Sequence, residues 1–479
     1  MSRIFFLKPG GAQTNFPHCY ATLIAHVREQ GHQAAFYDAS LSKPSPQTLL
    51  SSLDFSGYDC LGISLLTGWH PWVKAFVSLF KARHPNIPII VGGPHVSALG
   101  IEAVRHLQAD FGVVGEGEIP LGMLLDALKK NDAFESIPNL IFKNGQDYQI
   151  STKPRERIKE LDRLPLPAYD VVKPENYFHT YLGASVPRRY FQSVQTVTSR
   201  GCPFQCTFCA TNATWLRRMT FHSPEYVVRE LQLLRRQHGV RELWFGDDGF
   251  TAHRNRAMEI CERMIAEKLD LVWRIPNGIR LETIDDRLAG LMRKAGCYMT
   301  GIGVETGSPQ VMQRIKKKLA LSLIQEKVAL LRRHHILTSG FFIVGFPDET
   351  ADELRETIDF ILRSPFDRMQ ISIFAPYPGS EDFQRLFQDV SQKDYSPAVQ
   401  AYLDRGILPK YPVQLPIDQI QKVFSRTYLR FYLQPRVVWS LLRDLRPRQF
   451  LDVLAHPGFQ RIFLFRRDAK ETYVEFGNV

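Results

Sequence analysis

Three cysteines, Cys202, Cys206 and Cys209, lie within eight residues and are the side chains of this chain best suited to chemistry. Their C-x3-C-x2-C spacing allows three thiolates to hold three irons of a four-iron cluster. Ferredoxins supply four cysteines to a cluster that passes electrons. A site with three cysteines leaves one iron open to a small molecule, so the pattern predicts a cluster that also does chemistry.

A structural zinc site and scattered core cysteines are the alternative interpretations of this pattern. Zinc sites typically take a fourth ligand and use paired C-x2-C spacings. The nearest candidate for a fourth ligand, His222, lies in no such pattern. The iron–sulfur interpretation is therefore favoured.

The elements around the cysteines indicate how they are positioned. The β-rich run TVTS (196–199) precedes them, and Gly201-Cys202-Pro203 turns the chain. The cysteines are thus predicted on a loop at the carboxyl end of a strand, where α/β folds place their sites. A strand-then-helix rhythm recurs about six times over residues 196–385, which suggests an open (β/α)6 barrel. Its later strands are expected at 241–248, 271–280, 298–308, 338–347 and 368–379.

Residues 1–135 predict a second α/β unit. Continuously apolar runs that alternate with helical stretches imply a doubly wound parallel sheet with helices on both faces. These strands are expected at 3–9, 34–39, 60–66, 87–93 and 111–117. Ligands bind at the carboxyl ends of such strands, and glycines there allow close approach of a large flat ligand. The small and polar residues at these ends are Ser64, Thr67, Gly92, Gly93, Gly115, Glu116 and Gly117.

The remaining regions are a connector and a tail. Residues 136–195 are predicted to connect the two units, beginning with a hairpin at 139–151 whose Asn144-Gly145 pair favours a type I′ turn. Residues 386–479 predict a helical, basic region, with a helix at 417–435. We expect this helix to pack on the barrel. An interfacial surface that meets a lipid-like substrate or a membrane is the alternative.

Composition limits the class of protein. The 479 residues are 44% hydrophobic and 23% charged, as in ordinary folded proteins. Seven cysteines without a disulfide framework suit a reducing cytoplasm. The start, MSRIFFLKPGG, is predicted to be a strand and not a signal peptide, and no apolar run of transmembrane length appears. The net charge is +11, and residues 404–470 hold 13 Lys/Arg against 5 Asp/Glu, which would suit an anionic substrate, a membrane surface, RNA or a solvated face.

The cysteine spacing, with aromatic Phe208 before the third cysteine, resembles the signature of the radical S-adenosylmethionine (SAM) superfamily. The resemblance implies a 4Fe–4S cluster whose open iron binds SAM. It places Gly246, Asp247 and Asp248 where the family contacts the SAM ammonium group. It also implies that Arg280 pairs with a carboxylate and that Glu305 accepts hydrogen bonds from the ribose.

The order of the glycine-bearing strand ends resembles the cobalamin-binding domain found upstream of many radical SAM modules. In that family, segments matching Ser64–Thr67 and Gly92-Gly93 line the pocket for the cobalamin tail. The loop after the first strand, KPGGAQTNFPHCY, lacks the Asp-x-His-x-x-Gly motif whose histidine ligates cobalt in other cobalamin domains. The lower cobalt ligand is therefore left open, and a degenerate domain that binds nothing is the alternative.

Together these resemblances imply a cobalamin-dependent radical SAM enzyme that uses a 5′-deoxyadenosyl radical and methylcobalamin to methylate an unactivated carbon of a small-molecule or lipid-like substrate. An electron donor such as a flavodoxin with its reductase, or a ferredoxin, is also implied. Three alternatives remain: an oxidative cyclase of the anaerobic porphyrin type, an RNA-modifying enzyme, and a non-catalytic iron–sulfur electron carrier. The absence of a recognisable RNA-binding module disfavours nucleic acid as a partner.

Overall fold

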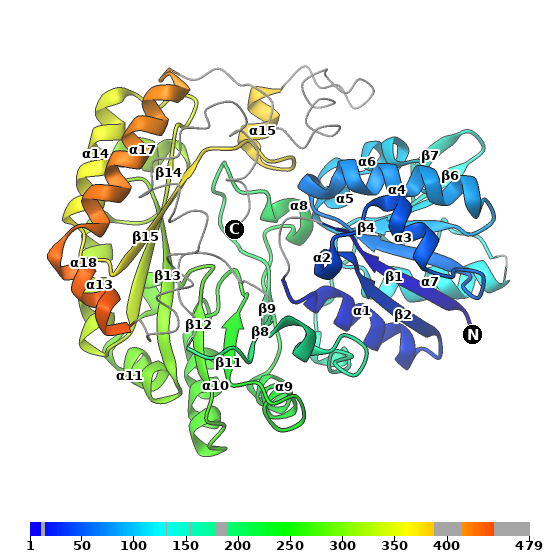
Figure 1. Ribbon diagram of the computed structural model, residues 1–479, viewed down its shortest axis with the longest axis horizontal. Helices are drawn as coiled ribbons and strands as arrows, with labels where there is room; N and C mark the ends of the chain where they lie inside the picture. The colour runs from blue at the N-terminus through cyan, green and yellow to red at the C-terminus, as the bar shows by residue number, and fades with distance from the viewer. Residues whose placement is uncertain (11–14, 131, 154, 179–188, 388–413, 445–479) are drawn as a thin grey trace.

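Two α/β units lie side by side, with a helical segment against the second (Figure 1). The computed structural model describes residues 1–10, 15–130, 132–153, 155–178, 189–387 and 414–444. The first unit appears in blue and cyan, the second in green and yellow, and the helical segment in orange. The predicted α/β class with two parallel sheets is therefore confirmed.

The first sheet has the order β2-β1-β3-β4-β5-β6-β7, and its first five strands run parallel. Alternate side chains of β1 enter different cores, because Ile4 and Phe6 pack on one face and Phe5 and Leu7 on the other. This explains the continuous apolar runs, since helices cover both faces. The parallel strands are β1 (Arg3–Lys8), β2 (Gln33–Asp38), β3 (Cys60–Ser64), β4 (Ile89–Gly92) and β5 (Phe111–Val113). Their helices are α1 (His18–Glu29), α2 (Ala39–Ser42), α3 (Pro46–Ser52), α4 (His70–Arg83), α5 (Pro94–Leu99), α6 (Ile101–Leu107) and α7 (Glu118–Lys130).

The predicted hairpin extends this first sheet. Strands β6 (Leu140–Asn144) and β7 (Asp147–Ile150) are antiparallel, and β6 pairs with β5. The expected type I′ turn was wrong. Asn144 pairs with Asp147, so the turn residues are Gly145 and Gln146, and the positive φ of 65° falls on Gly145 alone. One positive φ at the first turn position is the pattern of a type II′ turn.

The second sheet has six parallel strands in the order β15-β14-β13-β12-β11-β8. Adjacent strands follow one another in sequence, as in an open barrel. The strands are β8 (Ser193–Thr196), β11 (Glu242–Phe245), β12 (Val272–Ile275), β13 (Cys297–Glu305), β14 (Leu337–Val344) and β15 (Arg368–Ile373). The helices are α9 (Pro224–Gln237), α10 (Arg254–Ala266), α11 (Asp286–Lys294), α12 (Pro309–Arg314), α13 (Leu321–Arg333), α14 (Ala351–Arg363) and α15 (Glu381–Leu386).

Local signals in the sequence set where two barrel helices begin. The Ser223 hydroxyl accepts a hydrogen bond from Tyr226 N, and Pro224 occupies the first turn of α9. Thr350 and Glu353 form a capping box at the start of α14. Helix α9 begins three residues after the end of the short strand β10 (Thr220–Phe221), and α14 begins seven residues after the end of β14, so these caps set where the connecting loops end.

The helical segment covers the free edge of the barrel. The predicted helix at 417–435 is α17 (Ile417–Tyr432), and Pro435 opens a second helix, α18 (Pro435–Asp444). Tyr428 and Tyr432 use their hydroxyls to bond backbone groups of β15, including Ile371 N at 3.0 Å and Met369 O at 2.9 Å. The rest of the predicted basic tail, residues 388–413 and 445–479, lies outside the described residues.

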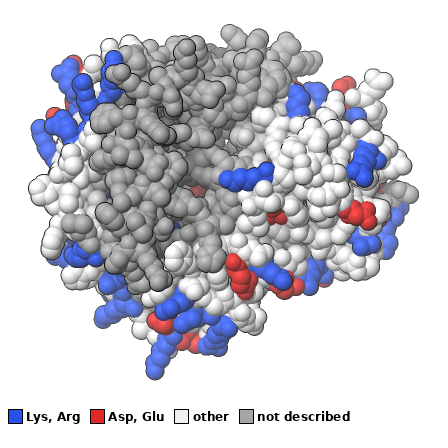
Figure 2. All heavy atoms as spheres, in the orientation of Figure 1, with Lys and Arg blue, Asp and Glu red and all other residues white. Residues whose placement is uncertain are grey.

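The described residues on the face that Figure 2 shows form no dominant charged patch. Their Lys and Arg side chains lie mostly around the rim and are interspersed with Asp and Glu. Among the described helices, none combines the length and the apolar character needed to cross a bilayer.

Candidate functional site

The cysteine loop joins a small ribbon to a short helix. Strand β9 (Ser199–Arg200) pairs with β10 (Thr220–Phe221), and α8 (Thr211–Trp215) follows the third cysteine. Gly201 turns the chain with φ 91°, and a Cβ there would lie 2.1 Å from Arg218 O. A larger residue is therefore excluded, and Cys202 must begin the loop where it does.

The three cysteines are free and partly exposed. Cys209 N–H donates to Cys206 O at 3.1 Å, which folds the loop back on itself. Burial raises the pKa of Cys202, and it raises the pKa of Cys206 to about 11. The charge of Cys209 adds to both shifts.

The donor set fits a cluster better than a single ion. Within the part of the chain that the structure describes, no three Cys, His, Asp or Glu side chains are placed to hold one metal ion. A four-iron cluster takes each thiolate on a different iron, so its ligands need not converge on one point. Metal binding also requires the thiolate form, which a positive charge nearby favours.

Lys317 supplies such a charge, and sequence reasoning missed it. Its Nζ lies 3.0 Å from Oε1 of Glu305, at the carboxyl end of β13. Burial lowers the pKa of Lys317, but Glu305 and then Cys206 outweigh burial and raise the pKa overall. The charge of Lys317 in turn lowers the pKa of Cys206. Lys317 stands in a run of three lysines, and such a run usually marks a solvated face. Nothing in the sequence therefore indicated that Lys317 pairs with Glu305.

The structure separates the roles of the two predicted carboxylates after β11. Asp247 is fully buried and accepts hydrogen bonds from Thr198 N, Thr198 Oγ1 and Ser199 Oγ, so it braces the chain before the cysteine loop. Asp248 is solvent-accessible yet enclosed by protein on most sides. Burial and the neighbouring Asp247 raise the pKa of Asp248 to about 6.

Other predicted residues also lie around the cysteine loop. The Arg280 guanidinium stacks 3.7 Å from the ring centroid of Phe204, within that loop, and pairs with Glu282 at 2.9 Å. Phe208 packs edge-on against Phe346, after β14, with ring centroids 6.1 Å apart. Gly246 accommodates Gln195, since a Cβ would lie 2.2 Å from Gln195 Nε2.

The predicted corrinoid residues meet at the carboxyl end of the first sheet. Ser64 pairs with Gly92 in register, and Gly93 has φ 94° with space for no Cβ, which would lie 2.6 Å from Ser64 Oγ. Gly115 N–H donates to Ser97 Oγ at 2.9 Å. Thr67 begins a short 3-10 helix (Thr67–Trp69) after β3. The structure therefore brings these strand ends together, as the parallel order predicts.

The two predicted residues that follow Gly115 in the loop after β5 have different surroundings. Gly117 lies against Leu23, with a Cβ position 3.2 Å from Leu23 Cδ2. Glu116 is buried, and its carboxylate pairs with Arg157 and Arg200. These partners come from the connector and from β9, so Glu116 faces the barrel side.

Two buried imidazoles beside these strand ends, His70 and His95, and the half-buried His106 were also missed. His70 Nε2 lies 2.9 Å from His106 Nδ1, and the His70 and His95 rings are 5.1 Å apart. Burial holds the pKa of His95 well below its usual value. Neither ring nitrogen of His95 has a hydrogen-bond partner among the described residues. The three histidines are 25 and 11 residues apart, so their association was not visible in the sequence.

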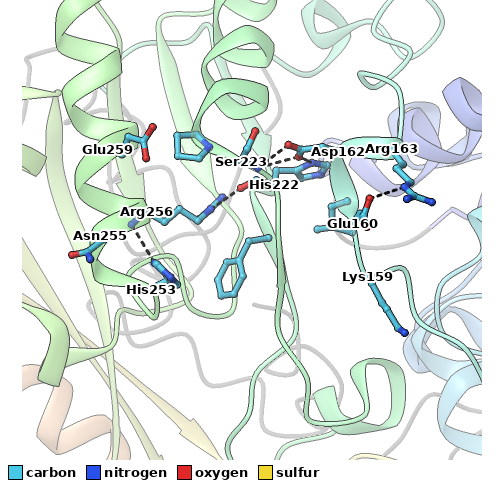
Figure 3. Close-up of a pocket in the computed structure, with 13 residues that line it drawn as sticks. Lys159, Glu160, Asp162, Arg163, His222, Ser223, His253, Asn255, Arg256 and Glu259 are labelled. Atoms are coloured by element: carbon cyan, nitrogen blue, oxygen red, sulfur yellow. Dashed lines mark hydrogen bonds and ion pairs between the residues drawn. The ribbon is translucent and has the colours of Figure 1, made fainter.

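A separate hollow of about 710 Å³ opens between the connector and the starts of α9 and α10 (Figure 3). No cluster cysteine lines it. His222 lies there, hydrogen-bonded to Asp162 at 3.0 Å and stacked on Tyr226, and burial lowers its pKa to about 4. His222 is therefore engaged away from the cysteine loop.

Comparisons with known proteins agree with this geometry. Residues 196–361 match the Radical SAM superfamily, and residues 19–125 match the B12 binding domain. An uncharacterized methyltransferase of Pyrococcus horikoshii is 29% identical over 93% of this chain and 92% of its own length. The anaerobic magnesium-protoporphyrin IX monomethyl ester cyclase of Rubrivivax gelatinosus is 26% identical over 96% of this chain and 84% of its own.

The fold is shared with a solved methyltransferase. The structure of the radical SAM methyltransferase TsrM from Kitasatospora setae, with cobalamin and a 4Fe–4S cluster bound, gives a TM-score of 0.68 at 18% identity. The match covers 83% of this chain and 80% of TsrM. Sequence and fold therefore agree on both halves of the molecule: the chain combines a B12 binding domain with a Radical SAM domain, an arrangement that it shares with the cobalamin-bound radical SAM methyltransferase TsrM.

Proposed function

We propose that this chain is a cobalamin-dependent methyltransferase that acts on an unactivated carbon of a small-molecule or lipid-like substrate. The observation that carries the proposal is the contact between the two halves at their sites. Helix α8, directly after the cysteines, packs against α5, directly after the Gly92-Gly93 turn. A Cβ on Gly379 would lie 2.6 Å from Ala213 of α8 and 3.1 Å from Ala98 of α5. The elements that carry the two predicted cofactor sites therefore adjoin, which supports the proposal.

When bound, the cluster with SAM would supply a substrate radical and the corrinoid would supply a methyl group. The chain's own residues would position these groups. Cys202, Cys206 and Cys209 would hold the cluster, and the Lys317 charge would favour their thiolate form. Asp248, accessible and carboxylate-bearing, suits the SAM ammonium group better than Asp247, whose oxygens are already occupied.

Glu305 and the glycine turns would contribute in different ways. Glu305 has φ 71°, which directs the end of β13 away from a regular strand and toward Lys317. A carboxylate there suits the hydroxyls of a ribose. At the first sheet, Gly92, Gly93 and Gly115 would let the backbone approach the corrinoid tail.

Anaerobic reconstitution with iron, sulfide and hydroxocobalamin tests the cofactor set. We expect about four irons per chain and one bound corrinoid, read by metal analysis and optical spectra. The matched control replaces Cys202, Cys206 and Cys209 by alanine and should bind corrinoid without iron. Iron without corrinoid in the wild type would contradict the methyl-transfer proposal.

An oxidative cyclase is the second candidate, favoured by the likeness to the Rubrivivax gelatinosus cyclase along nearly the whole chain. Product mass separates the two: methylation adds about 14 Da, whereas cyclisation removes hydrogen or adds oxygen. A protein that binds the cluster but never cleaves SAM would instead be an electron carrier.

A further inference from the structure

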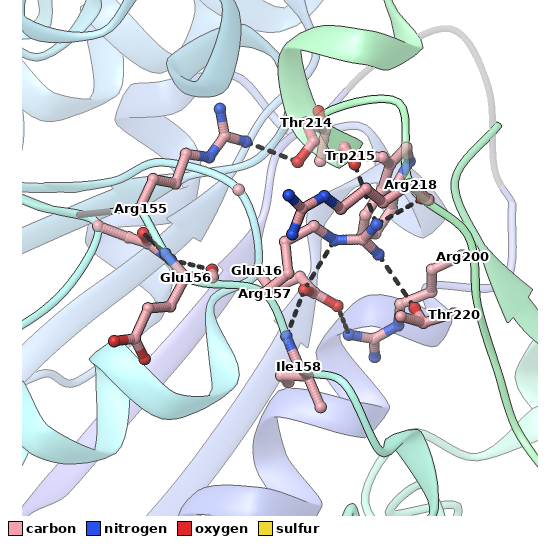
Figure 4. Close-up of polar contacts among 12 residues, drawn as sticks. Glu116, Arg155, Glu156, Arg157, Ile158, Arg200, Thr214, Trp215, Arg218 and Thr220 are labelled. Atoms are coloured by element: carbon pink, nitrogen blue, oxygen red, sulfur yellow. Dashed lines mark hydrogen bonds and ion pairs between the residues drawn. The ribbon is translucent and has the colours of Figure 1, made fainter. Parts of the chain in front are cut away.

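A buried charge network joins the loop after β5 to both ends of the cysteine loop (Figure 4). Glu116 lies at its centre. Its Oε1 accepts from Arg200 Nη1 at 2.9 Å, and its Oε2 accepts from Arg157 Nε at 3.2 Å and Ile158 N at 2.9 Å. Arg200 also donates to Glu118 at 2.6 Å. We call Glu116, Glu118, Arg157 and Arg200 the interdomain clasp.

The second half of the clasp reaches the far end of the cysteine loop. Arg157 Nη1 donates to Trp215 O at 3.0 Å and to Arg218 O, and its Nη2 donates to Thr220 Oγ1 at 3.0 Å. Figure 4 shows Arg157 between Glu116 and this segment. Every guanidinium nitrogen of Arg157 therefore donates a hydrogen bond.

The residues of the interdomain clasp and their partners stand next to both predicted cofactor sites in the sequence. Arg200 stands two residues before Cys202, whereas Trp215 ends the helix that follows Cys209. Glu116 lies between Gly115 and Gly117, in a loop predicted to contact the corrinoid. The Glu116 carboxylate thus connects the loop after β5 to Arg200, just before the cysteine loop. Through Arg157 it also connects that loop to Trp215, after the cysteine loop.

Burial makes the clasp rigid. The side chains of Glu116, Glu118, Arg157 and Arg200 are between 2% and 11% exposed. The two glutamates raise the pKa of Arg200 in spite of its burial. Exposed ion pairs exchange freely with water and contribute little, but removing one partner of a buried pair leaves an uncompensated charge. A shift of residues 115–118 must therefore move the cysteine loop with it.

We propose that the interdomain clasp couples corrinoid binding to retention of the iron–sulfur cluster, with Glu116 as a positioning residue and not a corrinoid ligand. This inference rests on the proposed function. Corrinoid at residues 115–118 holds that loop still, and through the clasp it holds Cys202 and Cys209 in the geometry that retains iron. Coupling of this kind is reciprocal, so the cluster also raises the affinity for corrinoid.

The test measures how fast reconstituted protein loses iron to a chelator, with and without hydroxocobalamin. We expect corrinoid to slow the loss about tenfold in the wild type, as when a coupling of about 1.4 kcal/mol between the two sites acts entirely on the release of iron. In Glu116→Gln, corrinoid should still bind but should leave the rate of iron loss unchanged. Glu102→Gln, which breaks an exposed ion pair with Arg105 in the same domain, is the matched control and should behave as wild type.

A second variant guards against misfolding of Glu116→Gln. Arg157→Lys keeps the charge but loses the fork of donors to Trp215 and Arg218, and it should reduce the corrinoid effect while the protein remains folded, as a cooperative thermal transition would show. In the reciprocal measurement, the variant without the three cysteines should bind hydroxocobalamin about tenfold more weakly than the iron-loaded wild type.

The outcomes separate the two proposals. If the wild type binds no corrinoid, the proposed function fails. If it binds corrinoid, and Glu116→Gln shows the same slowing of iron loss as the wild type, the coupling inference alone is overturned. Corrinoid that binds the wild type without changing its rate of iron loss overturns the inference in the same way.

Discussion

The two predicted cofactor regions are built from different parts of the chain. Around the cysteine loop the groups suited to chemistry are side chains: three thiols, the Lys317–Glu305 pair and the accessible Asp248. At the carboxyl end of the first sheet it belongs to the backbone, because Gly93 and Gly115 lie at positive φ. A region that holds a metal needs donor atoms, whereas one that admits a large flat ligand needs space.

This difference predicts that the two regions are sensitive to different kinds of substitution. Changes of charge or donor atom should damage the barrel region most, and added Cβ atoms should damage the first sheet most. Variants of each kind test whether the two regions differ in this way.

The largest effect is expected for Cys206→Ala. Removing one thiolate leaves a second iron without a protein ligand, so cluster binding and SAM cleavage should fall below detection. Iron analysis and the visible spectrum after reconstitution provide the measurement. Cys19→Ala, an exposed cysteine on α1, should keep full iron content. Normal iron in Cys206→Ala would mean that the cluster lies elsewhere.

Glu349 provides a pH-dependent test of buried charge in the barrel. Its carboxylate is fully buried and accepts from Gly345 N at 2.6 Å, and burial raises its pKa from 4.5 to about 7. Because the folded state favours the protonated form of Glu349, this residue contributes fully to the free energy of unfolding below pH 4.5. That contribution is lost as pH rises through 7. The loss amounts to about 3 kcal/mol.

Glu349→Gln should therefore be more stable than the wild type at pH 8 and similar at pH 4.5, measured by chemical unfolding across this range. A glutamine oxygen retains the acceptor for Gly345 N–H. Glu326→Gln, an exposed glutamate on α13, is the control and should leave the pH dependence unchanged. Parallel stability curves for Glu349→Gln and wild type would contradict the assignment.

Gly93→Ala tests the first sheet. The new Cβ would meet Ser64 Oγ at 2.6 Å and Leu65 backbone atoms at 2.9 Å, in a backbone conformation with positive φ. We expect a loss of about 2 to 3 kcal/mol in unfolding free energy and weaker binding of hydroxocobalamin. Gly31→Ala has similar positive φ but no atom within 4 Å, so it should cost about 1 kcal/mol and leave binding intact. Equal effects of the two variants would show that space at Gly93 is unimportant.

The smallest effect is expected for Lys317→Met. Without the Lys317 charge, the pKa of Cys206 should rise further above its present value of about 11, and alkylation of the metal-free protein at pH 9 should slow at this cysteine. Mass spectrometry of peptides treated with iodoacetamide measures the rate. Lys316→Met removes a neighbouring charge that pairs with Glu381 and should leave the rate unchanged.

Features encoded within a few residues were predictable from the sequence. The apolar strands of both sheets are confirmed, and the helix caps at Ser223 and Thr350 are formed by residues only three positions apart. The turn at Gly145 differed in type because strand register decided which two residues form it.

Roles that depend on contacts between distant segments were not predictable. Asp247 and Asp248 are neighbours in sequence, yet one is buried among Thr198 and Ser199 while the other remains accessible. Glu116 stood among predicted corrinoid contacts, but its partner Arg200 lies 84 residues away. Such roles are set by packing between the two halves.

The tyrosines of α17 bear on how this protein behaves when it is shortened. An open barrel ends in a strand whose backbone groups are available to a neighbouring molecule, and such edges promote aggregation. Tyr428 and Tyr432 occupy backbone groups of β15 at this edge. A chain that stops before residue 414 would leave β15 uncovered, and we expect it to accumulate as insoluble protein even though every cofactor residue is present.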